Sequence, residues 1–172
     1  LIRLHNPHDH FFKKVFSDPD DARLFLSKFL SPSLVRAIDF DDFSLVHGTH
    51  VDEELRESHS DLIFQTRLGG KPGYLYVLME HKSYPDHAVA FQLLKYMVRL
   101  WDSKPRKSPF SWILPVVFYH GSRPWGDVPR LSNLFDPVPE ELKAYFPNFE
   151  AELIDLIRFT DEEIKFRILE RV

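Results

Sequence analysis

Two acidic side chains and a lysine in the middle of the sequence are the residues whose types and spacing best suit catalysis. Asp61 opens one apolar segment, and Glu80 closes a second one, with Lys82 two residues further on. Pairing the two segments as a hairpin, with Leu68 opposite Gly73, places Asp61 directly opposite Glu80, where Cβ atoms lie about 4.5–5.5 Å apart. Lys82 shares their face if the strand continues, because side chains alternate along a strand.

A divalent cation would explain why two carboxylates stand so close together, since they repel each other unless a positive charge compensates them. A hard cation such as Mg²⁺ prefers oxygen ligands and keeps several of its waters. Lys82 beside such a water could stabilise hydroxide or neutralise charge that builds up on a phosphate. The register is inferred from the turn, and a slip of one residue would move Asp61 to the other face.

Ordinary explanations for the same residues are open at this point. Asp61 alone also suits a strand edge or a turn, and Glu80 could form a surface salt bridge with His81 or Lys82. Short acid-x-lysine strings are common. Glu80 is harder to explain in this way because it follows four apolar residues, and a charged group inside a core-like strand needs a partner.

The surrounding segments predict the elements that must position these residues. Residues 60–68 and 74–80 are expected to be strands joined by a glycine-rich turn at 69–73. Residues 113–120 form an almost unbroken apolar run, which suits a central strand buried on both faces. Further helices are expected at residues 8–16, 20–30, 140–145 and from 161 onward, a short helical or irregular piece at 33–38, and further strands at 43–46 and 150–158. This order predicts an α/β fold with a central mixed β-sheet flanked by helices.

A longer helix is expected between the two central strands, capped by Asp86 and running to about Trp101. Its apolar stripe, which predicts the face that packs on the sheet, consists of Phe91, Leu94, Val98 and Trp101. A second set at helical spacing consists of Gln92, Tyr96 and Arg99. For this second set a solvated surface and a functional face are equally open.

The composition is that of one folded domain. The chain has 172 residues, 44% of them hydrophobic and 16 of them phenylalanine, enough to bury a core. It has no cysteine, which excludes disulfides and thiolate metal sites. We expect a single domain over residues 1–172, truncated at its C-terminus, because the sequence lacks an initial methionine and stops within a helical pattern. A cytoplasmic protein without membrane contact is expected, because neither a signal peptide nor a spanning apolar run is present.

Other kinds of site receive less support from the sequence. The net charge of −4 does not favour a purely electrostatic DNA binder, although a metal site itself needs carboxylates. Nine histidines occur, but a zinc site is disfavoured because cysteines and a His-Glu-xx-His string are missing. The basic cluster of Lys104, Arg106 and Lys107 could contact a DNA backbone or lie in a solvated loop. Residues 119–123 follow a buried strand, where α/β sites gather, and a structural role is equally open for them.

Longer strings in the sequence resemble a known family. Asp61 followed by Glu80-x-Lys82 at a strand end resembles the PD-(D/E)xK nuclease signature. Four strings resemble the bacterial recombination-promoting nucleases, a family also described as transposases: His8-Asp9-xx-Phe12-Lys13-xx-Phe16, Ser60-Asp61-Leu62-Ile63-Phe64, Leu78-Met79-Glu80-His81-Lys82-Ser83 and Pro115-Val116-Val117-Phe118-Tyr119-His120-Gly121. The resemblance runs in the expected order from about His8 to Trp125.

This resemblance implies a restriction-endonuclease-like fold and a Mg²⁺-dependent DNA endonuclease linked to recombination or mobile-element activity, with Mn²⁺ or Ca²⁺ as substitute ions. Asp61 and Glu80 would bind the metal together with the backbone carbonyl of His81, and Lys82 would assist the attacking water. Many members carry glutamine where this chain has Lys82, so the lysine brings the chain closer to the general nuclease pattern.

Two further residues enter through the same resemblance. Gln92 matches a helix position where such nucleases often place a polar helper, although many relatives carry arginine there. Asp9 is a candidate accessory acid, but a helix N-cap is the simpler explanation for it. DNA is the expected partner, and a homodimer is compatible with the class.

Two alternatives come from other functional classes. One is a catalytically silent nuclease fold that binds DNA or protein, which the intact set of Asp61, Glu80 and Lys82 disfavours. The other is a transposase-associated subunit, suggested only by the family description.

Overall fold

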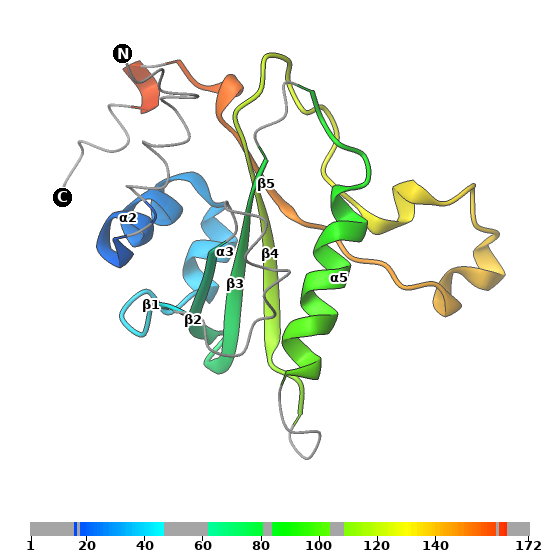
Figure 1. Ribbon diagram of the computed structural model, residues 1–172, viewed down its shortest axis with the longest axis horizontal. Helices are drawn as coiled ribbons and strands as arrows, with labels where there is room; N and C mark the ends of the chain where they lie inside the picture. Colours follow the sequence, from blue (N-terminus) through cyan, green and yellow to red (C-terminus); the bar gives the residue numbers. More distant parts are fainter. Residues whose placement is uncertain are drawn as a thin grey trace, which may run out of the picture.

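A five-stranded mixed sheet forms the centre of the molecule (Figure 1). The computed structural model describes Phe16 and residues 18–46, 62–80, 84–103, 109–160 and 162–164. The strands, in their order across the sheet, are β1 (Ser44–Leu45), β2 (Leu62–Leu68), β3 (Lys71–Glu80), β4 (Trp112–Tyr119) and β5 (Glu152–Asp155). β1, β2 and β3 are antiparallel neighbours, whereas β3, β4 and β5 run parallel. The mixed α/β sheet flanked by helices is therefore confirmed.

Helices cover both faces of this sheet (Figure 1). α2 (Pro19–Phe29) and α3 (Pro32–Ala37) lie on one face, and α5 (Val89–Asp102) lies on the other. Short 3-10 helices follow later in the chain, η1 (Leu131–Leu134), η2 (Glu140–Tyr145) and η3 (Leu156–Arg158). Among the described residues, none of the helices combines the length and apolar character that crossing a bilayer would require.

The alternation of side chains along the strands divides the interior into two apolar cores. On the α2 side, the buried residues include Phe16, Phe25, Phe64, Leu75, Val77, Val116 and Phe118. On the α5 side, they include Tyr76, Leu78, Leu93, Tyr96, Val117 and Tyr119. β4 contributes to both cores, so the expectation of a central strand buried on both faces is confirmed.

The β2–β3 hairpin differs from the predicted register. Gly69 and Gly70 have φ values of 55° and 77°, the left-handed pair that a two-residue turn requires. The turn contains only these two residues, so Leu68 pairs with Lys71. The predicted turn over 69–73, with Leu68 opposite Gly73, is wrong. The error is two residues, which keeps every side chain on its face. However, the direct opposition of Asp61 and Glu80 loses its basis, because Leu62 pairs with Val77.

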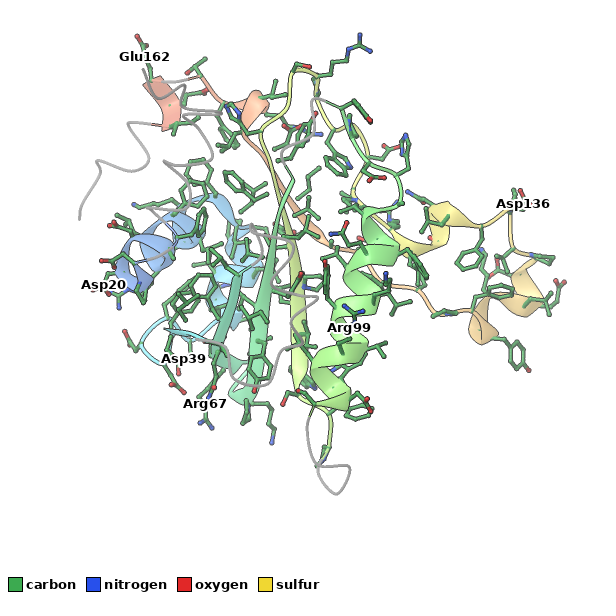
Figure 2. The ribbon with its side chains drawn as sticks, viewed as in Figure 1. Asp20, Asp39, Arg67, Arg99, Asp136 and Glu162 are labelled. Atoms are coloured by element: carbon green, nitrogen blue, oxygen red, sulfur yellow. The ribbon has the colours of Figure 1, made fainter. Side chains whose placement is uncertain are left out.

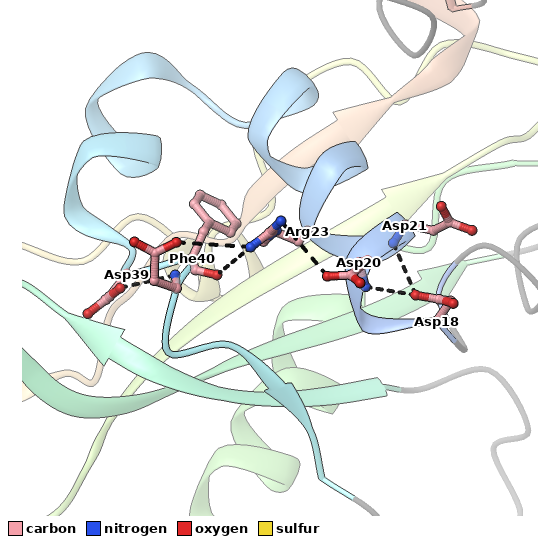
Figure 3. A network of polar contacts seen from close by, with 7 residues as sticks. Asp18, Asp20, Asp21, Arg23, Asp39 and Phe40 are labelled. Atoms are coloured by element: carbon pink, nitrogen blue, oxygen red, sulfur yellow. Dashed lines mark hydrogen bonds and ion pairs between the residues drawn. The ribbon is translucent and has the colours of Figure 1, made fainter. Parts of the chain in front are cut away.

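The start of α2 shows how local chemistry sets an element boundary (Figure 3). Asp18 caps the helix by accepting hydrogen bonds from the backbone N–H groups of Asp20 and Asp21, and Pro19 occupies the first turn, where its missing N–H costs nothing. Arg23 then connects the helix to the loop after α3, through the Phe40 carbonyl and a 4.0 Å ion pair with Asp41. The helix predicted at 20–30 is confirmed over Pro19–Phe29.

α5 packs on the sheet through a different face from the one predicted. The buried residues of α5 are Val89, Ala90, Leu93, Tyr96, Met97 and Leu100, whereas Phe91 and Val98 of the predicted stripe are 53% and 50% exposed. The helix is apolar on most of its circumference, so spacing alone offers two stripes. The stripe that is buried contains Tyr96, whose ring stacks on Tyr76 of β3 at 5.1 Å between centroids.

The later elements agree with the prediction except in their ends. Residues 140–145 form the expected short helix, of 3-10 type. The strand expected over 150–158 ends at Asp155 and continues as η3, because the Asp155 carboxylate accepts the Ile157 backbone N–H and caps that helix. Residues 8–15 and 165–172, which carry most of the first and last predicted helices, lie outside the described residues.

Candidate active site

The carboxyl ends of the three parallel strands lie side by side at one edge of the sheet. Glu80 pairs with Tyr119, and Tyr119 pairs with Asp155, so the last residues of β3, β4 and β5 form one row. Open α/β sheets bind their ligands outside the carboxyl ends of the strands. This edge is therefore where the geometry of the fold favours a site.

Only part of the predicted site falls within the described structure. Glu80 is the last residue of β3, and its side chain lies outside the described part. Asp9, Asp61, His81 and Lys82 also lie outside the described residues. The structure therefore shows the backbone position of Glu80, which lies in the row of strand ends.

Gln92 lies in α5 and is partly buried. Its Nε2 is 3.5 Å from the Tyr96 hydroxyl, a long hydrogen bond, and Tyr96 is buried against Tyr76. Tyr76 stands four residues before Glu80 on the same strand. Of the set at helical spacing, Tyr96 is therefore buried, whereas Gln92 and Arg99 are partly exposed.

Asp155 is a buried carboxylate that the sequence analysis did not single out. It is 3% exposed and accepts three hydrogen bonds, from the backbone N–H groups of Trp125 at 3.0 Å and Ile157 at 3.2 Å and from Arg158 Nε at 3.3 Å. These donors come from the segment after β4 and from η3, so Asp155 ties both to the end of β5. The available signal was an acid closing an apolar strand, the same signal that identified Glu80.

Residues 119–123 have a packing role in the described structure. The Tyr119 hydroxyl donates to the Arg123 carbonyl at 2.8 Å, and its ring meets Trp125 edge to face at 4.8 Å. A Cβ atom on residue 121 would overlap the Tyr119 ring, so only glycine fits there. For Tyr119 and Gly121, of the two roles left open, the structure supports the structural one.

A cavity of about 220 Å³ adjoins this part of the molecule. It is bounded on one side by Asp86, His87 and Val89 at the start of α5, and on the other by residues 125–130 and Asn133. Within the described ranges, no three His, Cys, Asp or Glu side chains are grouped closely enough to hold a metal ion. The basic cluster at 104–107 lies outside those ranges.

Comparison with known proteins identifies the kind of chain this is. The family model described as "Putative transposase, YhgA-like" matches residues 6–172. The chain is 34% identical to the recombination-promoting nuclease RpnD of Escherichia coli O157:H7 over 164 residues, which cover 92% of this chain and 62% of RpnD. It is 30% identical to the recombination-promoting nuclease RpnC of Escherichia coli K12 over 169 residues, covering 92% of this chain and 53% of RpnC.

A third relative carries a different description. The inactive recombination-promoting nuclease-like protein RpnE of Escherichia coli K12 is 29% identical over 164 residues, covering 92% of this chain and 54% of RpnE. The chain thus spans little more than half the length of these three curated relatives. No solved structure matches it.

Proposed function

We propose that this chain, which belongs to the YhgA-like family of putative transposases, is a metal-dependent DNA endonuclease that serves recombination or the activity of a mobile element. The observation that carries the proposal is the position of Glu80, which ends a β-strand in a row of parallel strand ends. The names of the relatives RpnD and RpnC, both recombination-promoting nucleases, support the same activity.

The proposed metal ligands are the carboxylates of Asp61 and Glu80 with the backbone carbonyl of His81. If the pairing of β2 and β3 continues by one residue beyond Leu62, position 61 faces Leu78 and lies diagonal to Glu80, at about 7–8 Å between the two backbones. An all-oxygen donor set fits Mg²⁺, and Mn²⁺ or Ca²⁺ would be accepted as substitutes.

The roles of the side chains follow from their chemistry. When bound, the cation supplies Lewis acidity and makes a coordinated water more acidic. Lys82 holds the attacking water and offsets negative charge on the phosphate as the water oxygen bonds to phosphorus. As the bond from phosphorus to one bridging oxygen breaks, the proton that the attacking water loses passes to solvent, and the departing oxygen takes a proton from solvent. DNA is therefore the proposed partner and substrate.

Gln92 and Asp9 are assigned supporting roles in this proposal. The amide of Gln92 is positioned by Tyr96 on the face of α5 that covers β3, and it would orient a water or a phosphate oxygen. Asp9 would act as an accessory acid near the site.

The experiment that tests the proposal is nicking of supercoiled plasmid with Mg²⁺ or Mn²⁺. We expect the 172-residue chain to nick the plasmid, EDTA to stop the reaction, and Asp61→Ala and Lys82→Ala each to abolish it. Asp136→Ala, which removes an exposed carboxylate far from the strand ends, is the matched control and should retain full activity. Nicking that survives both substitutions, or its absence from the wild-type chain, would contradict the proposal.

A second candidate is a catalytically silent module that binds DNA, and the description of RpnE as inactive is the observation that favours it. The same preparations distinguish the two functions. A silent module would retard duplex DNA on a gel without cutting it under any metal condition. Lys82→Ala would weaken its DNA affinity only by the contribution of one phosphate contact.

A further inference from the structure

The cavity of about 220 Å³ lies between the two segments that follow β3 and β4. One wall begins at Asp86, six residues after Glu80 ends β3, and continues into the start of α5. The other wall, residues 125–130, follows the end of β4 at Tyr119, which pairs with Glu80. Open α/β sheets bind their ligands in crevices of this kind. The cavity therefore adjoins the strand end at which the metal site is proposed.

The wall after β4 is held in place by residues of the strand ends. Trp125 is 8% exposed and donates its backbone N–H to the Asp155 carboxylate at 3.0 Å, while its ring packs edge to face on Tyr119. The next residue, Gly126, has a φ of 90°, and its carbonyl accepts a hydrogen bond from Arg158 Nη2 at 2.8 Å. Because these contacts lie within the chain itself, the cavity is formed before any ligand binds, as is usual for binding sites.

The lining of the cavity combines apolar surface with hydrogen-bonding groups. Val89, Trp125 and Val128 supply apolar surface, whereas Asp127 and Asn133 supply a carboxylate and an amide. Small-molecule sites have this composition, with a few polar groups that orient the ligand among apolar side chains. The ligand that fits is therefore a molecule or group with apolar faces and a polar edge.

The charges of the lining do not suit a phosphate. Asp86 and Asp127 both contribute carboxylates. The guanidinium of Arg130 also lines the cavity, but its Nε forms an ion pair with Glu150 at 2.6 Å. A phosphate in the cavity would meet two charges of its own sign. Carboxylate oxygens instead accept N–H donors, as when an aspartate accepts the amino group of cytosine.

The volume of the cavity limits the ligand to a single small ring system. Pockets for drug-sized ligands occupy about 300–1,000 Å³, so a cavity of about 220 Å³ takes a smaller group. A nucleobase is of this kind, with two apolar faces and one hydrogen-bonding edge. Proteins that take a base out of a duplex hold it between apolar or aromatic side chains and read its pairing edge with polar groups.

From this position and lining we infer that the cavity binds one unpaired nucleobase of the DNA substrate, next to the phosphate that is cleaved. The inference rests on the proposed nuclease function and adds a substrate class to it, DNA with an extrahelical nucleotide. Bases with an exocyclic amino group, such as cytosine, are preferred over thymine. The reason is that the Asp127 carboxylate accepts an amino N–H and repels the carbonyl oxygen that thymine has at the same position.

Single-turnover cleavage with Mg²⁺ tests the inference on three duplexes that differ at one position. One is fully paired, one has a bulged cytosine and one has a bulged thymine. We expect the wild-type chain to cut beside the bulged cytosine about tenfold faster than beside the bulged thymine, which is the discrimination that one good base contact provides. The fully paired duplex should be cut more slowly than either, because its bases cannot enter the cavity.

Asp127→Asn should reduce the cytosine-to-thymine ratio to about one, because an amide offers both a donor and an acceptor. Asp127 is exposed, so its substitution leaves the apolar cores intact. Asp136→Asn is the matched control and should keep the wild-type ratio. It removes the same charge from an exposed residue that does not line this cavity and lies at the outer end of the segment between β4 and β5 (Figure 2).

Equal cleavage of all three duplexes would overturn this inference and leave the nuclease function intact, and so would an unchanged ratio in Asp127→Asn. If the wild-type chain cuts none of the duplexes, the proposed function fails, and the dissociation constants of the same duplexes decide the inference by themselves. Binding of the bulged-cytosine duplex that is about tenfold tighter by fluorescence anisotropy would support it, and equal dissociation constants would overturn it.

Discussion

The two ends of β3 are built differently. At its first residue, β3 leaves a turn of two glycines with positive φ, and the neighbouring Arg67 donates to the Gly70 carbonyl at 3.1 Å on an exposed surface. At its last residue, β3 meets the ends of β4 and β5, where Tyr119 and Asp155 are buried.

The polar groups at the two ends of β3 therefore have different structural roles. At the turn, two glycines with positive φ satisfy the backbone conformation locally. At the carboxyl end, a buried carboxylate and a buried tyrosine hydroxyl hold the segments that follow the strands. A rigid second layer of this kind is what a catalytic site needs to keep its ligands in place.

The largest expected effect is at the carboxyl end of β3 itself. Glu80→Gln keeps the size of the side chain and removes the charge that would bind the cation. We expect single-turnover cleavage of a labelled duplex to fall by about 1,000-fold, equivalent to about 4 kcal/mol, with the melting temperature unchanged or raised. Glu150→Gln, on an exposed residue, should cleave at the wild-type rate. Equal rates for the two variants would remove Glu80 from the site.

The next largest effect is expected on the stability of the protein, at Asp155 in the row of strand ends. Asp155→Ala leaves two backbone N–H groups and Arg158 without their acceptor, so the free energy of unfolding should fall by about 2–3 kcal/mol. Urea denaturation measures this change. Glu150→Ala, which breaks only the exposed pair with Arg130, should cost less than about 1 kcal/mol. If both variants lose the same stability, Asp155 is not a structural anchor.

A smaller loss is expected where Tyr119 packs against Gly121. Gly121→Ala forces a Cβ atom into the Tyr119 ring, and the displaced ring should reduce the free energy of unfolding by about 1–2 kcal/mol. Thermal unfolding followed by circular dichroism would detect it. A Tyr119→Ala background is the control, because it removes both the hydroxyl and the ring carbons that the new methyl group would meet. In that background Gly121→Ala should cost no further stability, and an equal further loss would contradict the steric cause.

The smallest effect is expected at the opposite end of β3. Gly70 has a φ of 77° and open space around the position of a Cβ atom, so Gly70→Ala meets only backbone strain, about 1 kcal/mol. Gly70→Asn should cost less, because asparagine tolerates this conformation. Neither variant should change the cleavage rate, and a loss of cleavage would show that the two ends are coupled.

Most of the element pattern could be predicted from the sequence, because apolar runs and turn residues identify elements directly. The run at 113–120 predicted a central strand, and the segment 20–30 predicted the helix that the structure has over Pro19–Phe29. The register of the hairpin could not be predicted, because three glycines and a proline within residues 69–73 allow more than one turn. The two positive-φ glycines, Gly69 and Gly70, decide the matter only once the backbone is known.

Two other outcomes depended on tertiary contacts. Both faces of α5 carry apolar residues, so the sequence could not show that Tyr96 would meet Tyr76 and leave Phe91 exposed. Asp155 is an acid at the end of an apolar strand. Its burial depends on Trp125, which is 30 residues away in the sequence, and on Arg158 in the 3-10 helix that follows. Of the candidate site, the sequence indicated the strand end at Glu80, and its ligand geometry stays a prediction.

A divalent cation proposed at the carboxyl end of β3 can be located by affinity cleavage with Fe²⁺. Fe²⁺ replaces Mg²⁺ at oxygen sites, and with ascorbate and peroxide it cuts the polypeptide close to where it is bound. We expect cuts near residues 61 and 80–82 that excess Mg²⁺ suppresses and that Glu80→Gln abolishes. Cuts confined to other parts of the chain, or an unchanged pattern in Glu80→Gln, would contradict it.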